Sequence, residues 1–215
     1  MFDGFRPAVF EWFAGLERDN TREYFTATRD LYEREVRGGM EAMFDALSAE
    51  FDGEIKVFRQ HRDLRFTPDK RPYKDRTYGV LGRYYAALSS RGLYAGTGYY
   101  RVARDQLERY RAAVADDGSG PVLEAALATA GLEVAGMTLK TAPRGYPRDH
   151  PRIALLRRKQ LIVGGLVPGD GGLSRDAALG HVAGVWRAAA PVVDWLDEHV
   201  GPTTLPPPPG RYGSG

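Results

Sequence analysis

The sequence contains no cysteine. This absence excludes disulfides, a thiolate nucleophile, and zinc or iron–sulfur sites with cysteine ligands. Long apolar runs are also missing, since none approaches the roughly eighteen uninterrupted residues that a membrane span requires. The opening segment MFDGFRPAVFEWF carries charge within its apolar pattern and lacks the profile of a signal peptide. We therefore expect a cytoplasmic protein with no membrane partner.

Familiar catalytic motifs are absent as well. The segment Gly96–Gly98 begins a dinucleotide fingerprint but has Arg101 where the third glycine belongs. GGLVPGDGG lacks the Lys-Ser or Lys-Thr of a phosphate-binding loop, and neither GxSxG nor HExxH occurs. Pro68-Asp69 could open the acidic motif of restriction-type nucleases, but no acidic-x-Lys follows it. Because these motifs are absent or incomplete, the sequence identifies no reaction and leaves open whether the protein is an enzyme. It also gives no reason to expect a cofactor.

Charge is distributed unevenly along the chain, although the net charge is only +2. Residues 59–76 hold seven Lys or Arg against three Asp, and residues 140–159 hold seven against one. The remainder is therefore acidic. If the fold brings these two basic blocks together, they form one strongly positive surface suited to an anion.

The apolar pattern predicts helices at the start of the chain. One short amphipathic helix is expected over Pro7 to Gly15. Asn20 and Glu23 have the spacing of a capping box, so a long helix should run from Thr21 to about Phe51, with a kink or break at Gly38 and Gly39. Further helices are expected over 104–115, 121–130 and 175–199.

From Glu54 onward the period changes to two, which is typical of a strand reaching Phe66. The charged face of that strand contains Arg59, His61, Asp63 and Arg65. A proline-containing type I turn is expected over 67–70, followed by two strands in TYGVLGRYYAAL and GLYAGTGYYRV. The chain is therefore predicted to be one α+β domain over residues 1–201, an antiparallel meander flanked by N-terminal and C-terminal helices, followed by a flexible proline-rich tail over 202–215.

The second basic block is irregular at first because it contains Pro143, Gly145 and Pro147. Asp149-His150-Pro151 then has the form of a helix start, with basic residues in the short helix that follows. A helix start offers free N–H groups, and arginine forks grip phosphate or carboxylate at two points. The block therefore has the parts of an anion site.

Two long motifs carry a resemblance to a known family. RDLRFTPDKRPYK and LKTAPRGYPRDHPRIALLRRK, with GYY at 98–100, resemble the RDxRFxxDKxPYK and LKxxPxGYxxDHP blocks of the bacterial and fungal family called domain of unknown function 2461. The resemblance extends from Phe2–Phe5 to about Leu166, and the C-terminal helix and tail are less typical. Because the family has no established activity, the resemblance implies only that the two blocks are parts of one family pattern.

The candidate ligand-binding residues come from both basic blocks. They are Arg62, Arg65, Lys70, Tyr73, Lys74, Lys140, Arg144, Tyr146, Asp149 and His150. Asp63, Asp69 and His150 are the candidates for handling a proton. We expect no metal, although the spacing of His61 and Asp63 could direct both toward one ion.

Three functional interpretations remain open for these residues. The favoured one is binding of an anionic small molecule bearing phosphate or carboxylate, with or without a reaction. The second is a nucleic-acid-binding module in which basic and aromatic side chains alternate. The third is a structural or interaction domain in which the charges form an internal salt-bridge network.

Overall fold

The computed structural model describes residues 1–65 and 69–206. The chain forms two compact units. The first contains Met1–Thr97 and Val163–Ala189, and the second contains Gly98–Ile162 and the described residues from Ala190 onward. Within the described ranges, no helix is both long and apolar enough to cross a bilayer. The single domain expected over residues 1–201 stays a prediction, and each unit is described by itself.

A six-stranded antiparallel sheet has the order β2-β3-β4-β5-β7-β6. Its strands are β2 (Ile55–Val57), β3 (Arg76–Leu81), β4 (Tyr84–Ser89), β5 (Gly92–Tyr99), β6 (Glu133–Ala135) and β7 (Leu161–Pro168). In the β3–β4 hairpin, Leu81 pairs with Tyr84 around a turn in which Gly82 has a φ of 56°. Glycine adopts that left-handed conformation without steric cost. The predicted α+β fold with an antiparallel meander is confirmed.

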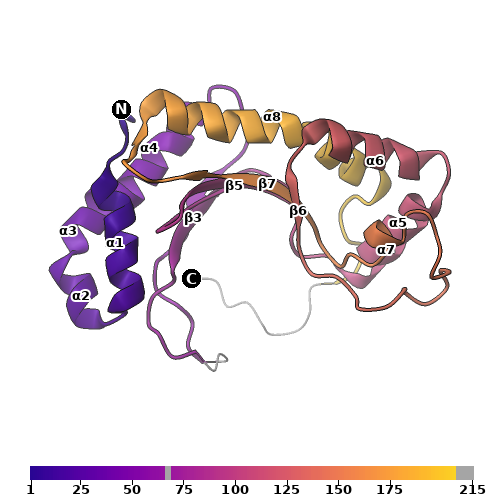
Figure 1. The fold of residues 1–215 in the computed structure, drawn as a ribbon, viewed down its shortest axis with the longest axis horizontal. Helices are drawn as coiled ribbons and strands as arrows, with labels where there is room; N and C mark the ends of the chain where they lie inside the picture. The colour runs from indigo at the N-terminus through magenta and orange to yellow at the C-terminus, as the bar shows by residue number, and fades with distance from the viewer. Residues whose placement is uncertain (66–68, 207–215) are drawn as a thin grey trace. The chain divides into compact units, whose positions relative to one another are not determined.

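The first unit begins with a short strand and a group of helices (Figure 1). They are β1 (Gly4–Phe5), α1 (Pro7–Arg18), α2 (Arg22–Ala27), α3 (Arg29–Leu31), the π-helix η1 (Tyr32–Arg37) and α4 (Gly38–Leu47). The long helix predicted from Thr21 to Phe51 is thus divided. Thr21, not Asn20, caps α2, because the Thr21 hydroxyl accepts a hydrogen bond from the Tyr24 N–H at 3.2 Å.

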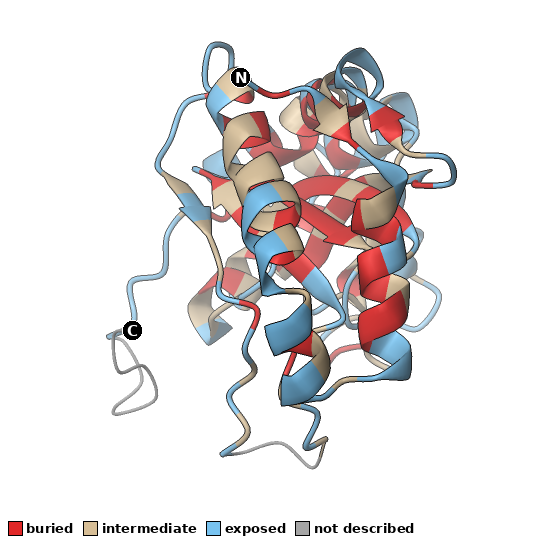
Figure 2. Cartoon of the chain, turned by 90° about the vertical axis from the view of Figure 1, so that its left-hand side faces the viewer, coloured by how far each residue is buried: buried red, intermediate tan, exposed pale blue. Residues whose placement is uncertain are grey.

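The core of the first unit joins these helices to the sheet. Trp186, from the part of α8 (Arg175–His199) that belongs to this unit, stacks on Tyr84 with ring centroids 4.8 Å apart. Its indole N–H donates to the Tyr85 carbonyl at 3.2 Å, and Phe44 of α4 stacks on the same indole. Figure 2 turns this unit toward the viewer and shows predominantly buried strands behind helices whose outward sides are exposed. A second sheet pairs β1 with β8 (Leu173–Ser174).

The second unit is mainly helical. It contains α5 (Arg104–Ala115), α6 (Ser119–Ala130), the single-turn α7 (Ile153–Leu156) and the C-terminal part of α8. Leu123, Leu156 and Leu196 are fully buried there. Beyond α8, Thr203 and Thr204 donate hydrogen bonds to the carboxylate of Asp105, so the start of the expected tail contacts α5. Residues 207–215 of that tail lie outside the described residues.

The strand predicted up to Phe66 is wrong beyond β2. Residues 58–65, here called the first arm, and 69–75, the second arm, contain no strand, and the one β-bridge between them within the described ranges joins His61 to Tyr73. Pro72 cannot donate to a ladder, which limits the pairing between the arms. The predicted alternation does hold, since the odd-numbered residues of the first arm from Arg59 to Arg65 are exposed and the even-numbered ones are less so. Phe66 and the first half of the predicted turn, residues 67 and 68, lie outside the described residues.

Candidate functional site

The two arms are fixed to the sheet by a buried glutamine. Gln60 is 2% exposed, and its side-chain amide donates to the Lys74 carbonyl at 2.6 Å. Its side-chain oxygen accepts from the hydroxyl of the equally buried Thr77 on β3 at 2.7 Å. Backbone bonds from Arg62 to Pro72 and from Lys74 to Gln60 complete the link. The positions of Arg59 and His61, on either side of Gln60, are therefore well defined.

Helix α2 holds the second arm through Tyr73. The Asn20 side chain exchanges two hydrogen bonds with the Tyr73 backbone, at 3.0 and 3.3 Å. The Tyr73 ring stacks on Phe25 of α2 with centroids 4.2 Å apart and planes 10° apart. The imidazole of His61 lies against both rings, at 5.5 Å from Phe25 and 4.9 Å from Tyr73. These contacts build one aromatic wall from three segments distant in sequence.

A pocket of about 320 Å³ lies beside this wall, within the first unit. Its charged lining residues are Arg22, Arg29, Glu33, Arg37 and Arg59. Its uncharged lining residues are Phe25, Thr26, Tyr32, Gln60, His61 and Tyr73. Four arginines face one glutamate, which makes the pocket strongly positive. Its volume is sufficient for a small molecule.

The π-helix supplies three of the lining residues, namely Tyr32, Glu33 and Arg37. Its hydrogen bonds run to the fifth residue rather than the fourth, as shown by the Gly38 N–H donating to the Glu33 carbonyl. Such segments are rare and frequently occur at functional sites. In the part of the chain that the structure describes, the hydroxyl of Tyr32 is the one buried side-chain polar atom without a hydrogen-bond partner. Burial raises the pKa of this phenol to about 12.

The arginines of the pocket are incompletely neutralised. Arg37 forms an ion pair with Glu41 at 3.0 Å, and Arg29 approaches Glu33 at 3.9 Å. Arg22 and Arg59 have no ion pair with any residue in the described ranges. Burial lowers the pKa of His61, and the charges of Arg59, Arg22, Arg29 and Lys74 lower it further. The imidazole is therefore neutral at pH 7 and lies in a positive potential.

The predicted residues of the first block mostly pair with one another. Arg62 and Arg71 both bind Asp69, at 2.5 and 2.7 Å, and Arg65 binds Asp63 at 2.7 Å. The hydrogen bonds from Arg65 lower the pKa of Asp63 to about 2, and those from Arg71 and Arg62 lower the pKa of Asp69. Carboxylates so stabilised in the charged form are weak bases at pH 7.

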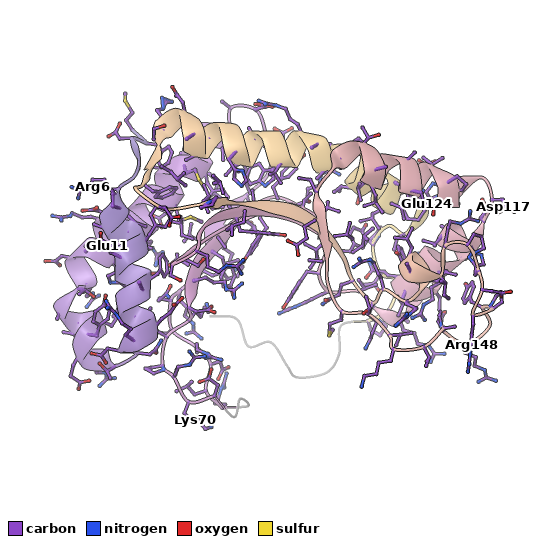
Figure 3. All side chains as sticks on the ribbon, viewed as in Figure 1. Arg6, Glu11, Lys70, Asp117, Glu124 and Arg148 are labelled. Carbon is purple, nitrogen blue, oxygen red and sulfur yellow. The ribbon has the colours of Figure 1, made fainter. Side chains whose placement is uncertain are left out.

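Three other predicted residues of this block have different surroundings. Tyr73 lines the pocket. Lys74 donates to the Arg59 carbonyl and lies over the Tyr78 ring at 4.7 Å, and burial lowers its pKa. Lys70 is exposed near the tip of the arms, where it donates to the Leu64 carbonyl at 3.2 Å (Figure 3). Among the described residues that line the pocket, Tyr73 is therefore the one that was predicted as a binding residue.

The second basic block lies in the other unit, and three of its arginines, Arg152, Arg157 and Arg158, bind backbone carbonyls. Arg152 is 6% exposed and donates to the Val114 carbonyl at 2.6 Å and to the Asp117 carboxylate at 2.7 Å. Arg157 donates to the carbonyls of Leu139 and Lys140, and Arg158 to two carbonyls of β6. These contacts hold the irregular segment to its unit.

The helix predicted at Asp149-His150-Pro151 begins later, at Ile153, and has four residues. Prolines at 143, 147 and 151 each lack an N–H, so three successive turns, closed by the N–H groups of Tyr146, His150 and Ile153, precede the helix in place of a continuous ladder. Within these turns, the His150 imidazole accepts a hydrogen bond from the Arg152 N–H at 3.0 Å. Arg157, Arg158 and Lys159, which were expected in the helix, follow it instead.

The remaining predicted residues of the second block lie on the surface of this unit. Lys140, Arg144 and Asp149 are exposed, and Tyr146 is half-buried. The labelled Arg148 marks this loop in Figure 3. Because the two blocks belong to different units, the site joining them stays a prediction.

Sequence reasoning missed the arginines that line the pocket. Arg22, Arg29 and Arg37 recur at intervals of seven and eight residues, about two helical turns each, and this spacing was a signal for one charged helical face. Arg59 was assigned to a charged strand face, but nothing in the sequence linked that face to the helix. No three metal-binding side chains cluster anywhere in the described part of the chain.

These features define a class: an α+β protein with an arginine-lined pocket in its first unit. The family model described as "Conserved hypothetical protein (DUF2461)" matches residues 8–195, and the chain belongs to this family. The match begins after the expected Phe2–Phe5 and continues through most of α8, beyond the expected limit at Leu166. No curated protein and no solved structure matches the chain. The resemblance is confirmed, and family membership brings no activity with it.

Proposed function

We propose that the arginine-lined pocket binds a small molecule that bears phosphate or carboxylate. The observation that carries the proposal is the unequal charge of the lining: four arginines face one glutamate, and Arg22 and Arg59 have no ion pair with any described residue. Guanidinium groups donate paired hydrogen bonds that match the oxygens of both anions. The ligand would supply the negative charge that the pocket lacks.

The pocket also has the stability that a binding site requires. Gln60 and Thr77 fix the first arm from the buried side, and Asn20 and Phe25 fix the second. A lining held in place before the ligand arrives loses less conformational entropy on binding. This preorganisation favours a specific ligand over a diffuse layer of counterions.

Calorimetric titration with phosphate and with citrate, at constant ionic strength, tests the proposal. We expect Arg22→Ala and Arg59→Ala each to weaken binding about tenfold or more, because each removes a charge-assisted hydrogen bond worth about 1.5–3 kcal/mol. Arg91→Ala is the matched control, since Arg91 is exposed in the β4–β5 turn of the same unit and does not line the pocket. Equal binding by all three variants would refute an anion site here.

A structural role is the second candidate for the two blocks themselves. The ion pairs of Asp63 and Asp69, and the carbonyl bonds of Arg152, favour it. Under this alternative, Arg152→Ala would lower the melting temperature and leave phosphate binding unchanged. The nucleic-acid alternative predicts instead that an oligonucleotide binds more tightly than phosphate, with an affinity that falls steeply as salt rises.

A further inference from the structure

The number of unpaired charges in the pocket indicates the charge of its ligand. Glu41 neutralises Arg37 through a hydrogen-bonded ion pair, and Glu33 lies 3.9 Å from Arg29. Two guanidinium groups, those of Arg22 and Arg59, then remain without a carboxylate among the described residues. A ligand with two negative charges would restore neutrality, whereas a monoanion would leave one cation uncompensated.

His61 is the titratable lining group that can respond to such a ligand. Cations face it from several elements: Arg22 from α2, Arg29 from α3, Arg59 from its own arm and Lys74 from the second arm. Glu33 and the phenol of Tyr32, from the π-helix, line the same pocket. The Phe25 and Tyr73 rings cover other parts of the imidazole and carry no charge. A dianion would offset most of the positive potential that these cations create at the ring, and this would raise the affinity of the imidazole for a proton.

The size and lining of the pocket indicate more than a bare inorganic ion. A phosphate group, counted as four oxygens of about 30 Å³ each by analogy with water, occupies roughly 120 Å³. The pocket holds about 320 Å³. The space beyond the phosphate borders Phe25 and Tyr73 as well as the arginines. It therefore suits an organic group attached to the phosphate.

We propose that the ligand is a small organic phosphate monoester in its dianionic form, and that His61 takes up one proton from solvent when the dianion binds. This inference rests on the proposed function of the pocket. The dianion contacts Arg22 and Arg59, and the imidazolium formed at His61 adds a third cation. Because proton and ligand binding are linked, each must strengthen the other by the same factor.

Sulfate and nitrate titrations into the full chain at pH 7.5 and constant ionic strength test the preference for a dianion. We expect sulfate to bind at least about tenfold more tightly than nitrate, since it meets the two guanidinium groups that have no ion pair with any described residue. Glycerol phosphate is expected to bind more tightly than inorganic phosphate, which distinguishes an ester from the free ion. Equal affinities within either pair overturn the corresponding part of the inference.

Sulfate also tests the proton uptake, because it remains a dianion between pH 8 and 5.5. We expect its affinity to rise about tenfold on acidification for each pH unit by which the bound dianion raises the pKa of His61. His61→Gln keeps hydrogen-bonding groups without a titratable ring, and its sulfate affinity should not change with pH. NMR titration should show the His61 ring signal, assigned with the same variant, moving to a higher pKa with sulfate.

The outcomes separate this inference from the function on which it rests. Sulfate affinity that is independent of pH in the unaltered chain, or an unmoved His61 titration, overturns the proton uptake. If nitrate equals sulfate but both depend on Arg22, the pocket binds anions and only the dianion proposal fails. Absence of any anion binding overturns both proposals together.

Discussion

Asn20 shows how one side chain can position a site that it does not enter. Its amide satisfies both the N–H and the carbonyl of Tyr73, 53 residues away in sequence. Tyr73 in turn stacks on Phe25 and lies against His61. The geometry of the pocket wall therefore depends on a residue that carries no charge.

We expect Asn20→Ala to lower the free energy of unfolding by about 1–3 kcal/mol, because it leaves two partly buried backbone groups without partners. It should also weaken sulfate binding, since the second arm loses its attachment to the start of α2. Urea unfolding and sulfate titration measure the two effects. Thr21→Ala is the control: loss of the α2 cap costs about 1 kcal/mol and should leave sulfate binding unchanged. Equal sulfate affinity in both variants would contradict this role for Asn20.

For single residues, the sequence was a better guide to which side chains matter than to the contacts that each of them makes. Asn20 was expected to cap a helix, because Asn is a good cap and Glu23 stood at the right spacing. The neighbouring Thr21 performs that function, and no local pattern could show that Asn20 pairs with Tyr73. The pocket arginines were visible as charges, but their convergence depends on contacts between distant segments.

At the scale of elements, glycine has two opposite uses in the first unit. A side chain at Gly79 of β3 would place its Cβ 2.6 Å from the Phe44 ring and 2.9 Å from the Lys56 carbonyl. Gly184, within α8, has no atom within 4 Å of the corresponding position. The first glycine permits close packing of a helix on the sheet, whereas the second leaves open space.

These two glycines give a matched pair of variants. We expect Gly79→Ala to destabilise the protein by about 1–3 kcal/mol or more through overpacking. Gly184→Ala should stabilise it by up to about 1 kcal/mol, because alanine is the better helix former. Thermal unfolding followed by circular dichroism compares them. A Gly79→Ala chain as stable as the original would show that Phe44 can move away.

Helices could be predicted more accurately than strands. The bounds expected for 104–115 and 175–199 agree with α5 and α8, because apolar periodicity persists over many residues. Strand β7 was not predicted, because the glycine-rich segment GGLVPGDGG was considered only as a possible phosphate-binding loop. A Cβ at Gly164 would lie 2.5 Å from the Ala95 carbonyl, so close packing explains that glycine. TYGVLGRYYAAL was read as one strand but contains the β3–β4 hairpin.

At the scale of the whole molecule, titratable groups whose pKa values are shifted by partial or full burial set the pH range of stability. Burial lowers the pKa of His61 and His181, and it raises the pKa of Tyr32 and Tyr85 to about 12. Below about pH 6.5 the unfolded chain binds protons at both histidines before the folded chain does. Above about pH 10 the unfolded chain loses phenol protons first. Both differences favour unfolding.

We therefore expect the free energy of unfolding to be highest between about pH 6.5 and 10 and to fall on either side. Asp63, with its pKa lowered to about 2, adds a further loss below about pH 4. Denaturant unfolding at pH 5, 8 and 11 measures the profile. The double variant His61→Gln, His181→Gln should show a smaller loss between pH 6.5 and 5. Unchanged stability of the original chain at pH 5 would contradict the assignment to histidine.

For the whole chain, the composition and the length of the two motifs determined how much could be predicted from the sequence. The two long blocks were enough to identify the family, and hydrophobic periodicity was enough for the fold class. The division into two units was not predicted, because no linker separates them and β5, β7 and α8 each continue from one unit into the other. The pocket was missed for a related reason: its lining comes from two helices, a π-helix and two arms.

The aromatic wall has a practical consequence for spectroscopy. The Trp12 ring lies 5.2 Å from Tyr32 and 6.1 Å from Phe25, both of which line the pocket. Its indole N–H is fixed by the Thr28 hydroxyl at 2.8 Å. The two other tryptophans, Trp186 and Trp195, belong to different clusters. With those two replaced by phenylalanine, the remaining indole emission would come from directly behind the pocket, so ligand occupancy could be followed optically without attaching a dye.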